Sequence, residues 1–242
     1  MKPLKIALIG YGKMGREIDA LAGERGHTIT CRINEDNLAV METALFKESD
    51  VAIEFTRPDS AVTNIKKCFN VHLPVVIGTT GWYDQYEEIT NLCKQQNQTM
   101  LAASNFSIGV NIFFEINKKL AQLMNGKPSY DVSISEVHHI AKVDKPSGTA
   151  ITLADQINDS VDRKNKWVVD QINPQKHEIN IVSEREANVI GKHTIRYHSD
   201  IDEIIIQHNA FSRKGFAEGA LLAAEFIWDK KGCFSMKDLL QV

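Results

Sequence analysis

A short segment in the middle of the chain brings together several side chains that could donate protons. It reads EVHHIAKVDKPSGTA, and His138, His139 and Lys142 place three potential cations within five residues. Histidine titrates near neutral pH, and crowding can lower the pKa of a lysine, so both residue types suit general-acid catalysis. We therefore expect this segment to carry the chemistry of the protein.

The residues that follow predict a binding place for an anion. Pro146 and the three residues after it form a loop that is expected to turn into a helix. Backbone N–H groups at a helix N-terminus attract a carboxylate, and two hydroxyls stand beside them. A plain helix cap is the alternative, but the neighbouring basic side chains favour a carboxylate site. Its residues are Ser147, Gly148 and Thr149.

A zinc site is the sharpest rival interpretation of two adjacent histidines. Lys142 stands where a third ligand would be needed, and the spacing fits no common zinc motif. Four cysteines lie far apart and form no CxxC pair, so reduced thiols in a cytoplasmic protein are expected. We predict that the protein holds no metal.

A second group of residues, at the start of the chain, predicts a dinucleotide site. The run Lys5 to Ile9 has the pattern of a buried strand, and glycines in GxGxxG spacing follow it directly. Gly10 permits the tight turn, Gly12 lets the backbone approach a pyrophosphate, and Gly15 lets the helix pack close to the strand. A merely structural turn is the alternative. The expected site residues are Gly10, Tyr11, Gly12, Lys13, Met14 and Gly15.

The choice between NADPH and NADH stays open. Asn34 occupies the end of the second predicted strand, where an acid usually holds the adenosine ribose hydroxyls. Asparagine can hydrogen-bond a hydroxyl but does not repel a 2′-phosphate. Lys13 and Arg32 would attract such a phosphate, whereas Glu35 and Asp36 oppose it. We expect either cofactor to be accepted.

Two later strand ends carry small polar residues, and ligands of open α/β sheets bind beyond the carboxyl ends of the strands. These segments could hold the nicotinamide carboxamide and the nearby ribose, although ordinary turn chemistry explains each of them alone. The candidate residues are Gly78, Thr79 and Thr80 after one strand, and Ala103, Ser104, Asn105 and Phe106 after the next.

The elements that would position these groups indicate an α/β protein with two domains. The first hundred residues alternate strand and helix, which favours a Rossmann-type parallel sheet with right-handed crossovers. Next comes a helix over 110–123, with Ile112, Phe113, Ile116, Leu120 and Leu123 expected on one side. A strand is expected over 130–137 and a helical segment over 153–157. Three more strands, over 178–183, 192–198 and 203–208, follow without a long helix between them, which predicts a smaller mixed sheet. A last apolar helix over 216–228 could return to the first domain.

The composition is that of an ordinary globular protein. Hydrophobic residues make up 43% of the 242 positions, charged residues make up 24%, and the net charge is −3. The basic residues are scattered, so we expect no nucleic-acid partner. No uninterrupted apolar run reaches the roughly 18 residues of a membrane helix, and no signal peptide is visible. A cytoplasmic protein without a membrane partner is expected.

The chain resembles the 4-hydroxy-tetrahydrodipicolinate reductase family, also called dihydrodipicolinate reductase, of the diaminopimelate and lysine pathway. The resemblance covers essentially the whole length. It is carried by IGYGKMG, by EFTRP at Glu54, by GTTG at Gly78, by ASNFSIGVN at Ala103 and by EVHHIAKVDKPSGTA. The last motif is highly specific for this family.

The resemblance implies roles for the candidate residues. His138 would be the catalytic acid/base and Lys142 a proton donor, while His139, Ser147, Gly148 and Thr149 would bind the carboxylates of a small cyclic dicarboxylate. Residues 1–106 and 213–242 would form the dinucleotide-binding Rossmann domain. Residues 107–212 would bind substrate and form a homotetramer. Lys145 departs from the family, which usually has alanine there, and Arg213 could face the cleft.

Two other functions remain as alternatives. One is a different two-domain Rossmann oxidoreductase, such as an aspartate or homoserine-type dehydrogenase. The other is a regulator that senses NAD(H) without turnover. The cluster of His138, His139 and Lys142 favours an enzyme, because a sensor needs no proton donor.

Overall fold

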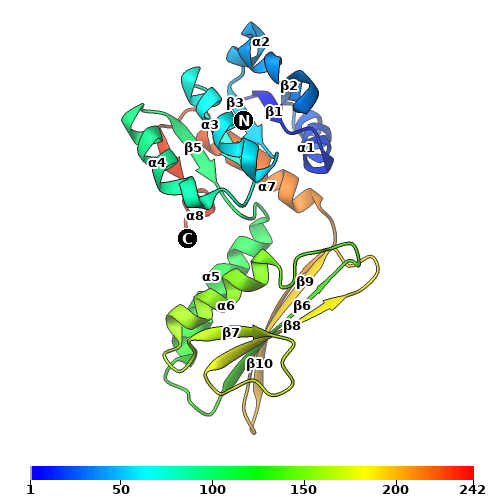
Figure 1. Ribbon diagram of the computed structural model, residues 1–242, viewed down its shortest axis with the longest axis vertical. Coiled ribbons are helices and arrows are strands. Elements are labelled where there is room, and N and C mark those ends of the chain that lie inside the picture. Colours follow the sequence, from blue (N-terminus) through cyan, green and yellow to red (C-terminus); the bar gives the residue numbers. More distant parts are fainter. Residues whose placement is uncertain (1) are drawn as a thin grey trace. The chain divides into compact units, whose positions relative to one another are not determined.

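The computed structural model describes residues 2–242, and the chain divides into two compact units (Figure 1). The first unit runs to Ile108 and resumes at Lys214. The second unit is Gly109–Arg213. In the described part of the chain, no helix is long and apolar enough to cross a membrane.

The first unit is built on a six-stranded parallel sheet in the order β11-β5-β4-β3-β1-β2. Most of its strands are short apolar runs, as expected for strands that are covered on both faces. In β3, for example, all four side chains are buried. The strands are β1 (Lys5–Ile9), β2 (Thr28–Ile33), β3 (Val51–Glu54), β4 (Val75–Ile77), β5 (Thr99–Ala102) and β11 (Gly232–Phe234).

Helices cover both faces of this sheet and enclose two apolar clusters. The helix that follows the second unit, α7 (Lys214–Ile227), packs against α1 and the central strands, so the chain does return to the first unit. The other helical segments are α1 (Lys13–Glu24), η1 (Glu35–Glu42), α2 (Ala44–Lys47), α3 (Pro58–Asn70), η2 (Tyr83–Gln85), α4 (Tyr86–Gln95) and α8 (Met236–Leu240).

The second unit is a five-stranded mixed sheet in the order β10-β9-β6-β8-β7. Strand β6 pairs parallel with β8 and antiparallel with β9. Helices α5 (Ile108–Met124) and α6 (Gly148–Ser160) lie against one face of the sheet (Figure 1). The strands are β6 (Asp131–His138), β7 (Lys166–Val169), β8 (Glu178–Arg185), β9 (Gly191–His198) and β10 (Glu203–Ala210). The predicted fold class, a Rossmann-type parallel sheet plus a mixed sheet, is therefore confirmed.

Most of the apolar residues expected on one side of α5 lie outside the face that packs on the sheet. Ile112, Ile116 and Leu123 are 45%, 48% and 60% exposed. Helix α5 carries two apolar stripes, and the stripe that packs on the sheet contains a polar residue, Asn117, which hid it in the sequence. The Asn117 side chain donates to the Leu153 carbonyl at 3.1 Å, so its polarity is satisfied inside the core. The buried residues are Val110, Phe113, Phe114, Asn117, Ala121 and Met124.

Candidate functional site

A polar row crosses one end of the sheet in the second unit. Alternation along β6 turns Val132, Ile134, Glu136 and His138 toward the helix-covered face. The register places Ile134 opposite Ile195 of β9 and Ile181 of β8, an apolar row. One step further along the strands, Glu136 lies opposite His193 and Ser183, and His138 lies opposite Arg185.

Glu136 is the centre of this row. Its carboxylate is fully buried and accepts hydrogen bonds from the Ser147 N–H at 3.0 Å and the Ser183 hydroxyl at 2.5 Å. The Nε2 of His193 lies 3.6 Å from Oε2. Burial by itself would raise the pKa of Glu136, but the donors His193, Ser147 and Ser183 hold it well below the usual range. The carboxylate is therefore an anion at neutral pH.

His138 is 7% exposed, and its Nδ1 lies 3.6 Å from Oε2 of Glu136. Gly191 on β9 leaves room for its ring, since a Cβ there would come within 3.2 Å of His138 Nε2. Burial and the nearby His193 lower the pKa of His138 to about 4, although Glu136 opposes the shift. The expectation of an imidazole that titrates near neutral pH therefore does not hold here. A bound carboxylate would raise this pKa, because it favours the imidazolium.

Lys142 and His139 lie in the loop after β6. The Lys142 ammonium contacts both carboxylate oxygens of Asp144, at 2.8 and 2.7 Å, and its side chain is 21% exposed. Arg185 of β8 fastens this loop, because its guanidinium donates to the carbonyls of Lys142 and Asp144. His139 is partly exposed, and its Nε2 lies 3.4 Å from the Arg213 guanidinium.

The predicted anion site is the N-terminus of α6, and its residues have different roles there. Ser147 is 2% exposed; its hydroxyl caps the helix by accepting from the Ala150 N–H, and it also contacts His193 at 3.1 Å. Its backbone N–H donates a hydrogen bond to the Glu136 carboxylate. The amides of Gly148 and Thr149 precede the first intrahelical hydrogen bond, so these groups suit an anion better than Ser147 does.

Lys145 does not point toward this polar row. Its ammonium pairs with Asp170, in the turn after β7, at 2.7 Å. The carboxylate of Asp170 also accepts from the Ser183 N–H at 2.9 Å. Lys145 therefore helps to hold a turn of the sheet.

Glu136, His138 and His193 offer ligand atoms within 4.8 Å of one another, which is a spacing that a metal ion could use. The carboxylate, however, already accepts hydrogen bonds from two serines, and the guanidinium of Arg185 lies 3.7 Å from it. These donors and this cation compete with a metal ion for the same oxygens. The set is therefore better described as a hydrogen-bonded ionic network.

In the first unit, each of the three motif glycines meets a different steric condition. Gly10 has a φ of +98°, and a Cβ there would lie 1.9 Å from the Phe55 carbonyl oxygen. A Cβ on Gly15 would lie 2.2 Å from the Gly10 oxygen, so the glycine allows α1 to approach the loop. Nothing lies within 4 Å of a Cβ on Gly12, which borders open space. This geometry fits a backbone that a pyrophosphate can approach.

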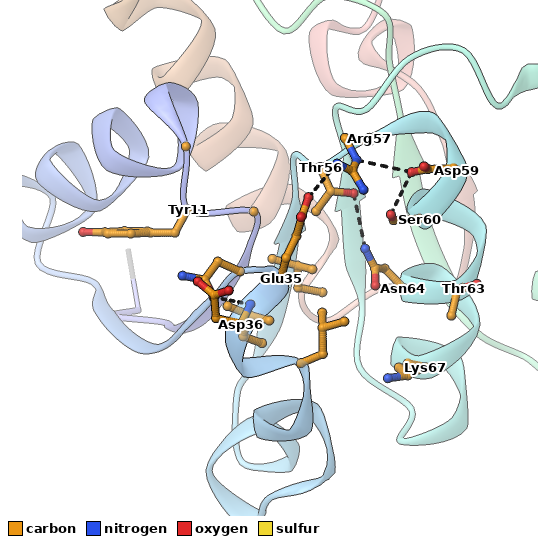
Figure 2. A pocket seen from close by; sticks show the side chains of 16 residues that line it. Tyr11, Glu35, Asp36, Thr56, Arg57, Asp59, Ser60, Thr63, Asn64 and Lys67 are labelled. Atoms are coloured by element: carbon orange, nitrogen blue, oxygen red, sulfur yellow. Dashed lines mark hydrogen bonds and ion pairs between the residues drawn. The ribbon is translucent and has the colours of Figure 1, made fainter.

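A cavity of about 580 Å³ opens beside this loop (Figure 2). Gly10, Tyr11, Gly12 and Asn34 line it, as expected for a dinucleotide site at the carboxyl ends of β1 and β2. Lys13, Met14 and Gly15 belong to the start of α1 and are not among its lining residues. The first turn of α1 has no acidic side chain and no side-chain cap, so its N–H groups remain available to an anion.

The charged residues near Asn34 are paired in ways that the sequence did not indicate. Asn34 is uncharged, and its Oδ1 caps η1 by accepting from the Asp36 N–H at 2.9 Å. Arg32 is bound to Asp19 through two hydrogen bonds. Glu35 pairs at 2.9 Å with Arg57, a residue of the opposite wall that sequence analysis missed (Figure 2).

The two other strand ends lie at the same edge of the parallel sheet as the glycine loop. A Cβ on Gly78 would collide with the Phe55 ring at 2.1 Å. The Thr79 hydroxyl accepts from the Thr56 N–H at 2.7 Å, which joins the ends of β3 and β4, whereas Thr80 is exposed. After β5, Ala103 and Asn105 are partly exposed, Ser104 is exposed and Phe106 is buried. None of these residues lines the cavity.

The residues that surround His138 were not predicted from the sequence. Glu136 and His138 are two positions apart on a strand, so alternation alone would have placed both on the buried face. His193 alternates with Ile195 and Tyr197 in the same way. That signal, a charged or titratable residue continuing a buried apolar row, could have identified Glu136 and His193.

Comparison with known proteins gives a consistent result. The family described as "Dihydrodipicolinate reductase, N-terminus" matches residues 4–106, and the family described as "Dihydrodipicolinate reductase, C-terminus" matches residues 109–240. A 4-hydroxy-tetrahydrodipicolinate reductase from Christiangramia forsetii is 47% identical, with 98% of each chain covered. A protein of the same name from Methanosarcina acetivorans is 34% identical, with 97% of this chain and 88% of that protein covered.

Solved structures share the fold. A dipicolinate-bound dihydrodipicolinate reductase from Paenisporosarcina superposes with a TM-score of 0.70 at 23% identity, covering 97% of this chain and 98% of that chain. An aspartate dehydrogenase from Thermotoga maritima also matches, with a TM-score of 0.51 at 13% identity and coverage of 93% and 97%. Such low identities establish the architecture alone. On the sequence matches to both halves and the 47% identity over nearly its full length, the chain belongs to the dihydrodipicolinate reductase family.

Proposed function

We propose that this enzyme reduces 4-hydroxy-tetrahydrodipicolinate, by way of dihydrodipicolinate, to tetrahydrodipicolinate with NADPH or NADH, as a step of diaminopimelate and lysine biosynthesis. One observation carries the proposal. A histidine and the open amides of a helix N-terminus are tied to one buried carboxylate, Glu136, at the end of β6, with a lysine in the loop between them. That combination offers proton transfer beside carboxylate binding. The names of the related proteins agree with it.

The first unit fits a nicotinamide dinucleotide. Gly10 and Gly12 carry no side chain in the loop before α1, Gly15 lets the helix pack close to that loop, and the cavity beside it is large enough for an adenosine portion. Lys13 and Met14 would add backbone N–H groups, and Asn34 would face the ribose. Gly78 to Thr80 and Ala103 to Phe106 would hold the nicotinamide end. The chemistry that the cofactor supplies when bound is a hydride.

The second unit would hold the substrate. The Gly148 and Thr149 amides would bind one ring carboxylate at the positive end of α6, and His139 would face the other. Hydride addition leaves negative charge that develops toward the ring nitrogen and must be relieved by a proton. Lys142, whose ammonium is bound to Asp144, would donate that proton, and His138 would relay it. The buried anion Glu136 would limit the cost of a positive charge on His138.

We further propose that both cofactors are used. Asn34 lacks the negative charge that rejects a 2′-phosphate, and the carboxylate of Glu35 is neutralised by Arg57. The Arg57 guanidinium could exchange Glu35 for a phosphate, since a guanidinium can bind a carboxylate or a phosphate through two N–H groups. Lys67 lines the same cavity and adds a positive charge.

We also propose a homotetramer in the cytoplasm, assembled through the second unit. The sheet face turned away from α5 and α6 carries Val182 and Ile205, which are 36% and 50% exposed. A second copy of this face would cover them. All four cysteines are free thiols, as a reducing compartment requires.

A single assay tests the proposed reaction. NADPH consumption would be followed with the cyclised product of pyruvate and aspartate semialdehyde as substrate. We expect NADPH oxidation with this mixture, and with NADP⁺ in place of NADPH we expect no oxidation of aspartate or homoserine. NADP⁺ reduction with either amino acid would identify one of the rival dehydrogenases, and cofactor binding without any turnover would identify a sensor.

A further inference from the structure

The Glu136 carboxylate connects the strands on both sides of His138 with the start of α6. Glu136 belongs to β6, and it accepts hydrogen bonds from Ser147 at the start of α6 and from Ser183 on β8. It also lies 3.6 Å from His193 on β9. A fully buried carboxylate is costly unless it is hydrogen-bonded, so such a group persists only where its contacts compensate.

The same carboxylate decides which nitrogen of His138 carries the proton. The Nδ1 of His138 has no hydrogen-bond partner among the described residues, and it faces Oε2 of Glu136 at 3.6 Å. An anion at this place favours the tautomer that is protonated on Nδ1. The Nε2 atom, beside Gly191, is then the nitrogen that can accept and return a proton.

The other groups that face His138 do not supply this effect. They are His193 on β9, Lys142 in the loop after β6 and Arg185 on β8, and all three disfavour a charged imidazole. Glu136 alone in this set favours it. Removing its charge should therefore change the protonation of His138 in a known direction.

We propose that Glu136 is a positioning residue for the reduction: it orients the His138 imidazole and ties the start of α6 to the sheet, so that the proton relay and the carboxylate-binding amides keep a fixed spacing. Glu136 itself touches neither substrate nor cofactor in this scheme. The proposal rests on the proposed function. In it, the charge of Glu136 orients His138, and the length of its side chain allows it to reach Ser147 at the start of α6.

Two variants separate charge from length. Glu136→Gln keeps the size but removes the charge, so kcat/KM should fall by about 10²-fold, the cost of misplacing a catalytic group by roughly 1 Å. The limb of the kcat/KM pH profile that reports His138 should also move to lower pH. Glu136→Asp keeps the charge but shortens the reach to Ser147. It should leave that limb in place and raise KM.

A matched control is Glu178→Gln, the same substitution on β8 of the same sheet. Glu178 is also buried, but it pairs with Lys166 at 2.8 Å, far along the strands from the polar row. Its pH profile should match that of the wild type. A Glu136→Gln enzyme with a wild-type pH profile and a changed KM alone would overturn the proposal. If that variant does not fold, unchanged kcat and KM in Glu136→Asp would overturn it instead.

Nitrogen NMR of the imidazoles keeps this test independent of the proposed reaction. The wild type should show His138 protonated on Nδ1, and Glu136→Gln should lose that preference. If the wild type failed to reduce the dicarboxylate, the proposed function would fall, while the NMR result would still decide whether Glu136 orients His138. A mixture of tautomers in the wild type would contradict the positioning role.

Discussion

Lys142 and Thr149 belong to one loop-and-helix segment, but they are expected to serve different steps. Lys142→Ala removes the proposed proton donor, so kcat should fall by ~10²–10⁴-fold, the usual range for a lost general acid. Thr149→Val removes a hydroxyl offered to a carboxylate. It should act mainly through KM, by about tenfold to a hundredfold, since a hydrogen bond to a charged group contributes ~1.5–3 kcal/mol. Steady-state kinetics separate the two effects.

The chain offers a control for this comparison in Lys145. Its ammonium is bound to Asp170, so Lys145→Ala should leave kcat nearly unchanged. His138→Ala should resemble Lys142→Ala, and the double variant should lose less than the product of the two if they act as a unit. A Lys142→Ala enzyme with full kcat and a raised KM would show that Lys142 only binds the anion.

The low pKa of His138 predicts how stability depends on pH. An unfolded chain protonates this imidazole near its ordinary pKa of 6.5, whereas the folded protein resists protonation down to about pH 4. Because the unfolded state then binds more protons, the free energy of unfolding is largest above pH 6.5 and falls toward pH 4. Between pH 6.5 and pH 4, the free energy of unfolding of His138→Asn should fall by about 2–3 kcal/mol less than that of the wild type. If thermal unfolding showed the same loss of stability in both proteins over this pH range, the low pKa of His138 would be refuted.

Cofactor preference is set by a few charges around Asn34. NADPH and NADH should give kcat/KM values within about tenfold of each other, or ~1.4 kcal/mol. Arg57→Ala removes a cation and frees Glu35, so it should shift the preference toward NADH. Kinetics with each cofactor measure both effects. A hundredfold preference in the wild type, in either direction, would contradict the proposal.

At the junction of β1 and α1, we expect Gly15 to affect the stability of the fold and Gly12 to affect cofactor binding. A Cβ on Gly15 would collide with the Gly10 oxygen at 2.2 Å, so Gly15→Ala should lower the free energy of unfolding by about 1–3 kcal/mol. Gly12 has a φ of −86° and open space at its Cβ position. Gly12→Ala should therefore fold within about 1 kcal/mol of the wild type but bind cofactor more weakly. Thermal unfolding and cofactor titration test this pair, and equal destabilisation by both would contradict it.

Patterns within single elements could be predicted from the sequence. The bounds of β1 agree with the predicted apolar run, and Pro58 stands in the first turn of α3, where proline is tolerated. The glycine spacing predicted a tight loop before α1, and it is present. These features depend on local sterics and periodicity, which neighbouring residues determine.

Contacts between distant elements could not be predicted in this way. His193 and Arg185 reach His138 only because β9 and β8 flank β6 in a particular register. The pairing of Arg57 with Glu35 depends on how α3 faces η1. Strand β7 and the buried face of α5 were not predicted for the same reason. Helix α5 has two apolar stripes, and only the sheet against which it packs determines that the stripe with Asn117 is buried.

In the whole molecule, the unit with the parallel sheet is proposed to bind the cofactor, and the unit with the mixed sheet is proposed to bind the substrate. The parallel sheet places the glycine loop, Asn34 and the later loops at one edge, because all its strands run the same way. The mixed sheet packs an apolar core under α5 and α6, and it ends in the polar row at Glu136. Each unit therefore supplies one set of ligands from the ends of its own strands.

The face of the mixed sheet turned away from its helices predicts how the chain assembles. Ile205 shares this face with Arg196 and is 50% exposed on the edge strand β10. Covering it with another copy buries apolar surface, so we expect light scattering to report four times the 27.2 kDa chain mass. Ile205→Lys would bury a charge and should yield smaller species, whereas Ile201→Lys, in a turn and 90% exposed, should stay tetrameric. A wild-type monomer at micromolar concentration would exclude this assembly.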